Sequence, residues 1–301
     1  MKDLISVIVL VDENVEPSIN VCLDSIVNQT YKNIDIVIIA SNATANTIKL
    51  CNYYKKKDKR ISLFLEEKKN KKNIGILKSR GKYITFVNGK DYLDKNYILQ
   101  VYNLIVDEDA DIVSTLLFKK KDNLKYSTYK KPEIMRGYLN LDDSSCYGKI
   151  YKKDLFENIK FKEGVNEDLK TTYKLFDKSK SVVISNIQKY HALNHTEVKK
   201  DTEYMERIYI LSDILTSIEK EYPSLISEAK KKICLEAFYM FPYIKLKSFR
   251  KQLYEYIKIY RKYVINDENV SLQNKMLSIS SLFGFSIMNL FLKVETILKK
   301  T

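Results

Sequence analysis

The sequence predicts an α/β protein in which a mixed, mainly parallel sheet is flanked by helices and followed by an all-helical C-terminal region. Over the first 120 residues, short β-branched runs alternate with segments of helical periodicity. This alternation is typical of a parallel sheet with covering helices. From residue 201 onward the pattern changes to amphipathic helices. We therefore expect two domains, residues 1–198 and 199–301.

The strands of the expected sheet are indicated by runs rich in Ile and Val. The run ISVIVLV at 5–11 is continuous, as in a strand buried on both faces. Further strands are predicted at 34–40, 61–65, 82–87, 111–118, near 148–151 and near 181–184, and helices at 17–28, 44–56, 94–106 and 167–178. Ligands of such sheets bind at the carboxyl ends of the strands. The residues after 11, 40 and 87 are therefore the first candidates for a site.

The C-terminal region ends in an apolar run from Leu277 to Leu292. A membrane-spanning helix needs about 20 apolar residues, and this run is shorter and interrupted by serines. We expect a core helix of the tail or, alternatively, docking on a membrane surface helped by Lys293, Lys299 and Lys300. The same helices are candidates for contact with a second copy of the chain or with a partner enzyme.

The chain has 301 residues and a net charge of +14, carried mostly by lysine. Arginine, which nucleic-acid interfaces favour, is rare, and no nucleic-acid motif is present, so we expect no nucleic-acid partner. The lysine excess indicates a solvated surface, a lysine-rich proteome, or attraction to anionic lipid or a polyanionic substrate.

The cysteines at 22, 51, 146 and 234 show no C-x-x-C spacing, and the N-terminus lacks the features of a signal peptide. These observations predict reduced thiols and a cytoplasmic location, with peripheral contact at the inner face of the membrane as an open alternative.

Three blocks carry a family resemblance. They are SVIVLV followed by CLDSIVNQTYKNIDIVII, then KYITFVNGKDYLDKNYI, and finally CYGKIYKKDLFENIKFKEGVNEDLKTTYKLF. In this order the blocks resemble the family-2 glycosyltransferases over roughly residues 4–195. The resemblance implies the GT-A fold, which is Rossmann-like, and a hexosyltransferase type of activity. It also implies a nucleotide-sugar donor, usually held with Mg²⁺ or Mn²⁺, and a carboxylate base that leads to inversion at the sugar.

The donor side departs from the family pattern. Ser41 and Asn42 stand where the family has two acids. Their side chains can hydrogen-bond a ribose or base edge, or they form a turn that caps the next helix. Asp12, after the first strand, is placed to reach a base. Lys72 takes the place of the family's Arg in Arg-Asn-x-Gly. The lysines around it form either a diphosphate-attracting rim or a solvated loop.

The family's metal-binding Asp-x-Asp appears here as Asn88-Gly89-Lys90, followed by Asp91. Divalent cations prefer carboxylate ligands, and the usual acids are missing. Mg²⁺ or Mn²⁺ therefore has only Asp91 as a weak candidate ligand. Two interpretations stay open for Lys90. Its ammonium replaces the metal against the diphosphate, or the site has decayed and Lys90 is solvated.

The acceptor side keeps the family pattern. By the resemblance, Asp168 of the Glu167-Asp168 pair is the general base and Glu167 orients the acceptor or the loop. Carboxylates at a helix N-terminus are also good caps, so a structural role stays open. Lys149 matches a lysine common in relatives. His191 and His195 lie near a position where some relatives have a metal-binding histidine, but without the Asp-x-Asp acids polar or core roles are favoured for both.

These features and the resemblance predict an inverting transferase that moves a sugar from a nucleotide-sugar donor to a cell-surface glycan or polymer, with metal independence left open. The alternative is a catalytically inactive homologue that binds a partner enzyme, a glycan or the membrane. Loss of the acids at two separate positions supports this alternative.

Overall fold

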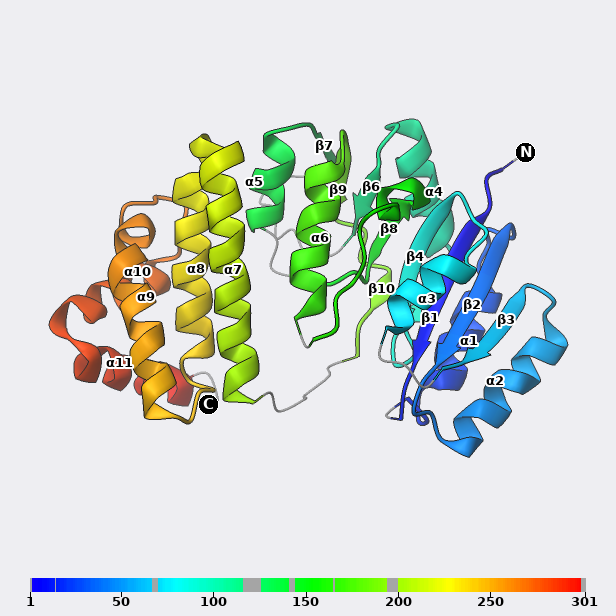
Figure 1. Ribbon diagram of the computed structural model, residues 1–301, viewed down its shortest axis with the longest axis horizontal. Helices are drawn as coiled ribbons and strands as arrows, with labels where there is room; N and C mark the ends of the chain where they lie inside the picture. The colour runs from blue at the N-terminus through cyan, green and yellow to red at the C-terminus, as the bar shows by residue number, and fades with distance from the viewer. Residues whose placement is uncertain are drawn as a thin grey trace. The chain divides into compact units, whose positions relative to one another are not determined.

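The computed structural model describes residues 2–13, 15–66, 70–115, 126–140, 144–164, 166–193 and 200–298. It divides into two compact units, Met1–His195 and Thr196–Thr301. We call them the N-terminal unit and the C-terminal unit and describe each by itself (Figure 1).

The N-terminal unit is built on an eight-stranded sheet in the order β3-β2-β1-β4-β8-β6-β9-β7. Its strands are β1 (Ile5–Val11), β2 (Ile34–Ala40), β3 (Ile61–Leu65), β4 (Tyr83–Asn88), β6 (Ile112–Ser114), β7 (Tyr126–Tyr129), β8 (Lys149–Lys152) and β9 (Val182–Ser185). β3, β2, β1 and β4 are mutually parallel, whereas β8 is antiparallel to β4 and β6. The predicted mixed, mainly parallel sheet is confirmed.

The helices of this unit are α1 (Ile19–Val27), α2 (Ala45–Lys57), α3 (Lys71–Lys78), α4 (Tyr97–Asp107), α5 (Glu133–Asn140) and α6 (Glu167–Lys178). Every residue of β1 and β2 is buried, which explains why both strands are continuous apolar runs rather than alternating ones. A short second sheet pairs β5 (Tyr92–Leu93) with β10 (Tyr190–His191) in antiparallel fashion. This pair joins the segment after β4 to a segment almost 100 residues later.

The segment between β3 and β4, which the sequence analysis treats as a loop, contains α3. Its sequence has a central glycine, which is unfavourable in an isolated helix. Tertiary packing explains the helix, because Gly75 lies against β1. A Cβ on Gly75 would stand 2.4 Å from Cγ2 of Ile8. The glycine therefore permits α3 to approach the sheet closely, and this approach sets the position of Lys72.

Other elements of this unit were also not expected. α5, β5, β7 and β10 are short, and strands of two to four residues give no readable alternation. The strand expected at 111–118 is observed as β6, and residues 116–118 lie outside the described residues.

The C-terminal unit is helical, as predicted. It comprises α7 (Asp201–Glu221), α8 (Ile226–Met240), α9 (Lys247–Ile265), α10 (Leu272–Ser280) and α11 (Phe285–Leu298), with a 3-10 turn η3 (Ser281–Phe283). It has its own hydrophobic core, to which α7, α8, α9, α10 and α11 contribute.

The apolar run 277–292 does not form the single helix expected for it. Gly284 has φ of 102°, a conformation that side-chain-bearing residues rarely adopt, and it separates η3 from α11. Leu277, Met288 and Leu292 are buried in the core of the unit, whereas other apolar side chains of the run are exposed. Within the described ranges, no helix is long and apolar enough to cross a bilayer.

Candidate active site

Three sequence-predicted segments meet at one edge of the sheet. Val11 of β1 pairs with Ala40 of β2, and Leu10 pairs with Asn88 of β4, so the three strands end side by side. The backbone N–H of Ser41 donates to the carbonyl of Val11 at 3.0 Å, and that of Gly89 donates to Leu10 at 2.8 Å. The loops that begin at Asp12, Ser41 and Gly89 therefore share the carboxyl edge, where such sheets bind ligands.

The turn after β2 is shaped by Asn42 and closed by Thr44. Asn42 has φ of 55°, in the left-handed region that asparagine tolerates. The cap of α2 is Thr44, whose hydroxyl accepts from the backbone N–H of Thr47 at 3.2 Å and donates to Glu16 at 2.5 Å. Hydrogen bonds from Thr44 and Asn46 lower the pKa of Glu16. The structure thus places the capping role on Thr44 rather than on Ser41 or Asn42.

The residues of the degenerate metal motif are engaged by the protein itself. The side-chain oxygen of Asn88 accepts from the backbone N–H of Lys90 at 3.0 Å. Asp91 is only 2% exposed. One of its oxygens accepts from the hydroxyl of Tyr190 at 2.6 Å and the other accepts from the backbone N–H of Leu193 at 3.1 Å. Asp91 therefore ties the end of β4 to β10.

This donor set does not fit a conventional Mg²⁺ or Mn²⁺ site. The carboxylate of Asp91 is already bonded to protein donors, and Lys90 brings a positive charge to the same turn. Among the described residues, no group of three or more His, Cys, Asp and Glu side chains is placed to hold a metal ion. His191 stacks on Tyr92, and its Nε2 lies 2.8 Å from Asp94. His195 lies outside the described residues.

The Glu167-Asp168 pair opens α6, as the sequence predicts, and its carboxylates converge on one lysine. Nζ of Lys72 lies 2.5 Å from Oε1 of Glu167 and 2.5 Å from Oδ1 of Asp168. The other carboxylate oxygen of Asp168 accepts from the backbone N–H of Cys146 at 3.1 Å. The base predicted by resemblance is therefore held by an ammonium and an amide.

The environment of this cluster is largely buried. Lys72 is 8% exposed, and its ammonium lies 5.1 Å from the ring centre of Phe161 and 5.9 Å from that of Tyr147. Burial by itself lowers the pKa of Lys72, but the electrostatic attraction of neighbours that include Asp168 and Glu167 outweighs it, so the pKa is raised. Burial also raises the pKa of Glu167, and Lys72 only partly offsets this effect.

α3 connects the two sides of the site. Lys71 pairs with Asp12, after β1, at 3.8 Å, while its neighbour Lys72 pairs with the carboxylates of α6. Asn73 exchanges two hydrogen bonds with the backbone of Phe161, at 2.8 and 2.9 Å, and so fixes the loop before α6 to α3. The Arg-Asn-x-Gly match thus marks the element that organises the site.

Lys149 acts on the loop before β8. The residue is fully buried, and its Nζ donates to the carbonyls of Ser145 at 2.8 Å and Tyr147 at 3.4 Å. These contacts shape the backbone around Cys146, whose N–H bonds Asp168. The sequence did not indicate Cys146, Tyr147 or Phe161 as site residues. Cys146 contributes only its backbone N–H, and Tyr147 and Phe161 contribute aromatic rings near Lys72, so none of them belongs to a sequence motif.

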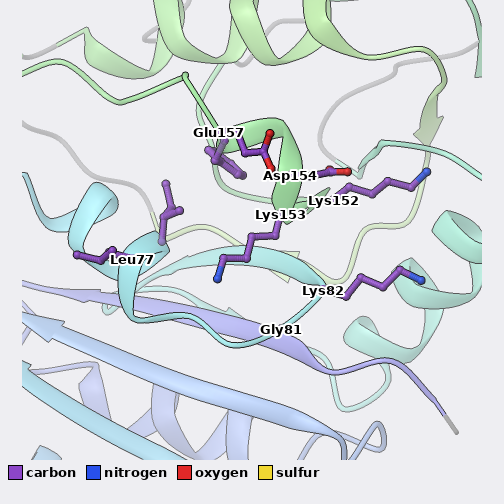
Figure 2. A pocket seen from close by; sticks show the side chains of 9 residues that line it. Leu77, Gly81, Lys82, Lys152, Lys153, Asp154 and Glu157 are labelled. Atoms are coloured by element: carbon purple, nitrogen blue, oxygen red, sulfur yellow. The ribbon is translucent and has the colours of Figure 1, made fainter.

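A separate pocket of about 530 Å³ lies away from these residues (Figure 2). Gly81 and Lys82, which line it, directly precede β4. Lys152, the last residue of the antiparallel β8, pairs with Tyr83 at the start of β4, and Lys153 comes next. The pocket is therefore at the amino end of β4, the edge opposite the predicted site. Its lysines bond protein groups: Lys153 donates to the carbonyl of Ser79 at 2.5 Å, and Lys82 pairs with Asp3 at 3.2 Å.

Comparison with known proteins agrees with this architecture. The model of the family described as Glycosyl transferase family 2 matches residues 6–167. The chain therefore belongs to glycosyl transferase family 2, and the resemblance seen in the sequence is confirmed.

The chain is 32% identical over 213 residues to glycosyltransferase GlyA of Streptococcus pneumoniae serotype 4, covering 63% of this chain and 30% of GlyA. It is 27% identical over 246 residues to the poly(ribitol-phosphate) beta-glucosyltransferase of Bacillus spizizenii, covering 72% of this chain and 37% of that protein. The chain thus spans about a third of the length of these curated relatives.

Among solved structures, S. aureus TarS 1–349 in complex with UDP-GlcNAc superposes with a TM-score of 0.67 at 16% identity, covering 100% of this chain and 92% of that one. This likeness shows the GT-A fold.

Proposed function

We propose that the chain is an inverting glycosyltransferase that moves a sugar from a nucleotide-sugar donor to a hydroxyl group of a cell-surface glycan or polymer. The observation that carries the proposal is the Glu167-Asp168 pair, which begins a helix and is held by Lys72. α3 links this pair to Asp12 at the carboxyl end of β1. The proposed base and the carboxyl edge of the sheet, where we place the donor, are thus linked through α3.

In the proposed reaction, Asp168 accepts the proton of the acceptor hydroxyl. The acceptor oxygen forms a bond to the anomeric carbon while the bond from that carbon to the diphosphate oxygen breaks, and the nucleoside diphosphate leaves from the opposite face. Developing negative charge on the leaving group needs a positive partner. We assign this role to Lys90, which follows β4 at the donor edge.

Two relatives support the choice of acceptor. One relative acts on poly(ribitol-phosphate). Another, from Campylobacter jejuni, is a GalNAc(5)-diNAcBac-PP-undecaprenol beta-1,3-glucosyltransferase, 24% identical over 248 residues, which cover 77% of this chain and 80% of that protein. Both relatives act on glycans or polymers of the cell surface, and we propose an acceptor of the same chemical class.

The test is a thermal-shift panel of UDP-, GDP-, CDP- and TDP-sugars, each with Mn²⁺ and with EDTA. A donor present at about 100 times its dissociation constant stabilises the fold by roughly 2.7 kcal/mol. We expect one base class to raise the unfolding temperature equally with Mn²⁺ and EDTA. A shift that requires Mn²⁺ would contradict metal independence.

The absence of a shift with every donor would favour the second candidate, a catalytically inactive homologue. The specific observation behind that candidate is the loss of acids at the donor edge, where Ser41, Asn42 and Asn88 stand in the places of acids.

We also propose that the C-terminal unit contacts an anionic membrane surface. Its last three elements expose a concentrated set of apolar side chains, each at least 42% exposed: Leu272, Met276, Ile279, Leu282, Phe283, Ile287, Leu290 and Phe291. Between 269 and 292 the only charged residue is Lys275. Exposed apolar patches of this kind mark interaction surfaces.

The positive charge of α9 favours an anionic lipid surface as the partner of these apolar side chains. α9 carries six basic residues and one acidic residue. Tyr254 and Arg261 of α9 donate hydrogen bonds to the carbonyl of Ser281 in η3, at 3.1 and 2.8 Å. Lys251 and Lys258 lie three and four residues from Tyr254, so they share that helix face. Basic side chains beside exposed Leu and Phe are typical of interfacial membrane binding.

Sedimentation with phosphatidylglycerol-containing vesicles tests this contact. We expect binding that weakens with salt, is reduced at least tenfold by Phe283→Ser or Leu290→Ser, and is unaffected by Leu77→Ser, an exposed leucine of the N-terminal unit. No binding, or a dimer that Phe283→Ser dissociates, would contradict the membrane proposal.

A further inference from the structure

Lys72 occupies a position that the proposed reaction does not explain by itself. It is a buried lysine whose ammonium contacts the carboxylates of Glu167 and Asp168, at 2.5 Å each. The aromatic rings of Phe161 and Tyr147 line its surroundings. A lysine held in this way is well placed to control the carboxylates it contacts.

The observed arrangement weakens Asp168 as a base. One of its oxygens bonds the ammonium of Lys72 and the other accepts from the N–H of Cys146. Both carboxylate oxygens are thus engaged by protein donors, which compete with the hydroxyl of an acceptor for the same lone pairs. An oxygen of Asp168 becomes available to the acceptor hydroxyl when the ammonium of Lys72 moves away.

A diphosphate is the group that fits as the alternative partner of Lys72. In a nucleotide sugar it carries as much negative charge as the two carboxylates together, and a lysine on a flexible four-carbon stem binds phosphate as a mobile point charge. The position of α3 allows this exchange, because Lys71, in the same helical turn, pairs with Asp12 at the donor edge. The first turn of α3 therefore borders both sides of the site.

We infer that Lys72 exchanges partners during the reaction: it holds the Glu167-Asp168 pair until a nucleoside diphosphate-sugar binds, and then moves to the diphosphate. Donor binding thereby releases Asp168 for the acceptor hydroxyl, and the donor binds first. This inference rests on the proposed transferase function. It makes Lys72 a positioning residue for the base.

Other ionisable groups also face this cluster. They are Lys71 from α3, Cys146, Tyr147 and Lys149 from the segment that enters β8, and Asp91 after β4. Among Lys71, Lys72 and Lys149, Lys72 is the lysine whose ammonium bonds both carboxylates. Removal of Lys72 is therefore expected to move the acid limb of the kcat/KM profile, which reports the enzyme before the donor binds, because the pair then retains a proton to higher pH.

The test compares Lys72→Met and Lys72→Arg with Lys78→Met, a control at the exposed end of the same helix. Binding of inorganic pyrophosphate, with EDTA present, is measured by calorimetry. We expect Lys72→Met to bind at least tenfold more weakly than wild type and Lys78→Met to bind unchanged. In the pH dependence of kcat/KM for the donor, which reports the free enzyme, we expect Lys72→Met to shift the acid limb upward by about one pH unit, equivalent to about 1.4 kcal/mol.

Lys72→Arg keeps the positive charge, so it serves as the control for a folding defect in Lys72→Met. The guanidinium fork favours staying on two carboxylates, so we expect a normal acid limb with a reduced kcat. Pyrophosphate affinity unchanged in Lys72→Met would overturn the partner exchange, as would an unmoved acid limb. The proposed function fails separately, if wild-type protein neither binds nor transfers from any donor of the panel.

Discussion

The acceptor side and the donor side of the site are built in different ways. On the acceptor side, two carboxylates, one ammonium and one backbone amide bond one another within a largely buried cluster. On the donor side, neutral Ser41, Asn42 and Asn88 follow the strands, and Lys90 supplies the charge. The difference indicates that the proposed base is held by a network of protein groups, whereas a donor at the proposed edge would be held by backbone groups, neutral side chains and cations.

Asp168→Asn removes the base and is expected to have the largest effect. General-base catalysis contributes about 10²- to 10⁴-fold to a rate, and we expect transfer to fall by that factor while donor binding is retained. Initial rates with the donor found by thermal shift are the measurement. Glu163→Gln, an exposed carboxylate just before α6, is the control. Nearly normal rates in Asp168→Asn would show that the base lies elsewhere.

Lys90→Ala tests the donor side. A hydrogen bond to a charged group contributes about 1.5–3 kcal/mol, so we expect donor affinity to fall roughly 10- to 100-fold, equally with EDTA and with Mn²⁺. Titration calorimetry is the measurement, and Lys95→Ala, an exposed lysine of the next turn, is the control. Equal affinities for Lys90→Ala and wild type would remove Lys90 from the proposed site.

Asp91→Asn separates a structural carboxylate from a metal ligand. The substitution places an amide N–H₂ where the protein already presents donors from Tyr190 and Leu193. An unsatisfied buried group costs about 1–3 kcal/mol, and we expect that loss in the free energy of unfolding measured with urea. Asp107→Asn, at the exposed end of α4, should change it little. Unchanged stability together with a lost Mn²⁺ response would instead identify Asp91 as a ligand.

The smallest effect is expected in the free energy of unfolding, through the titration of Glu167. Burial raises the pKa of Glu167 above its ordinary 4.5. The folded protein therefore binds this proton more tightly than the unfolded chain. The resulting stabilisation is present below pH 4.5 and is lost as the pH rises through the folded-state pKa. We expect the difference in unfolding free energy between wild type and Glu167→Gln to decline over the window just above pH 4.5. A difference that grows with pH would contradict the raised pKa.

Much of the fold could be predicted because its main signals are local. Continuous runs such as 5–11 and 34–40 can be buried on both faces only in a sheet that is covered on both faces, and helical periodicity identified α7, α8 and α9. The family blocks located Glu167 and Asp168 at the start of a helix, where a cap is favourable. Whether these two residues perform the assigned roles stays a prediction.

The sequence by itself thus determined the sheet, the helical C-terminal region, the family and the order of the segments at the donor edge, because each depends on short-range pattern. Tertiary structure decided the helix at 71–78, the burial of Asp91 against Tyr190, and the meeting of Lys72 with carboxylates more than 90 residues away. It also decided the break at Gly284 in an apolar run that reads as one helix. These features depend on close packing and on pairing between charges distant in the chain, and neither leaves a periodic trace in the amino-acid sequence.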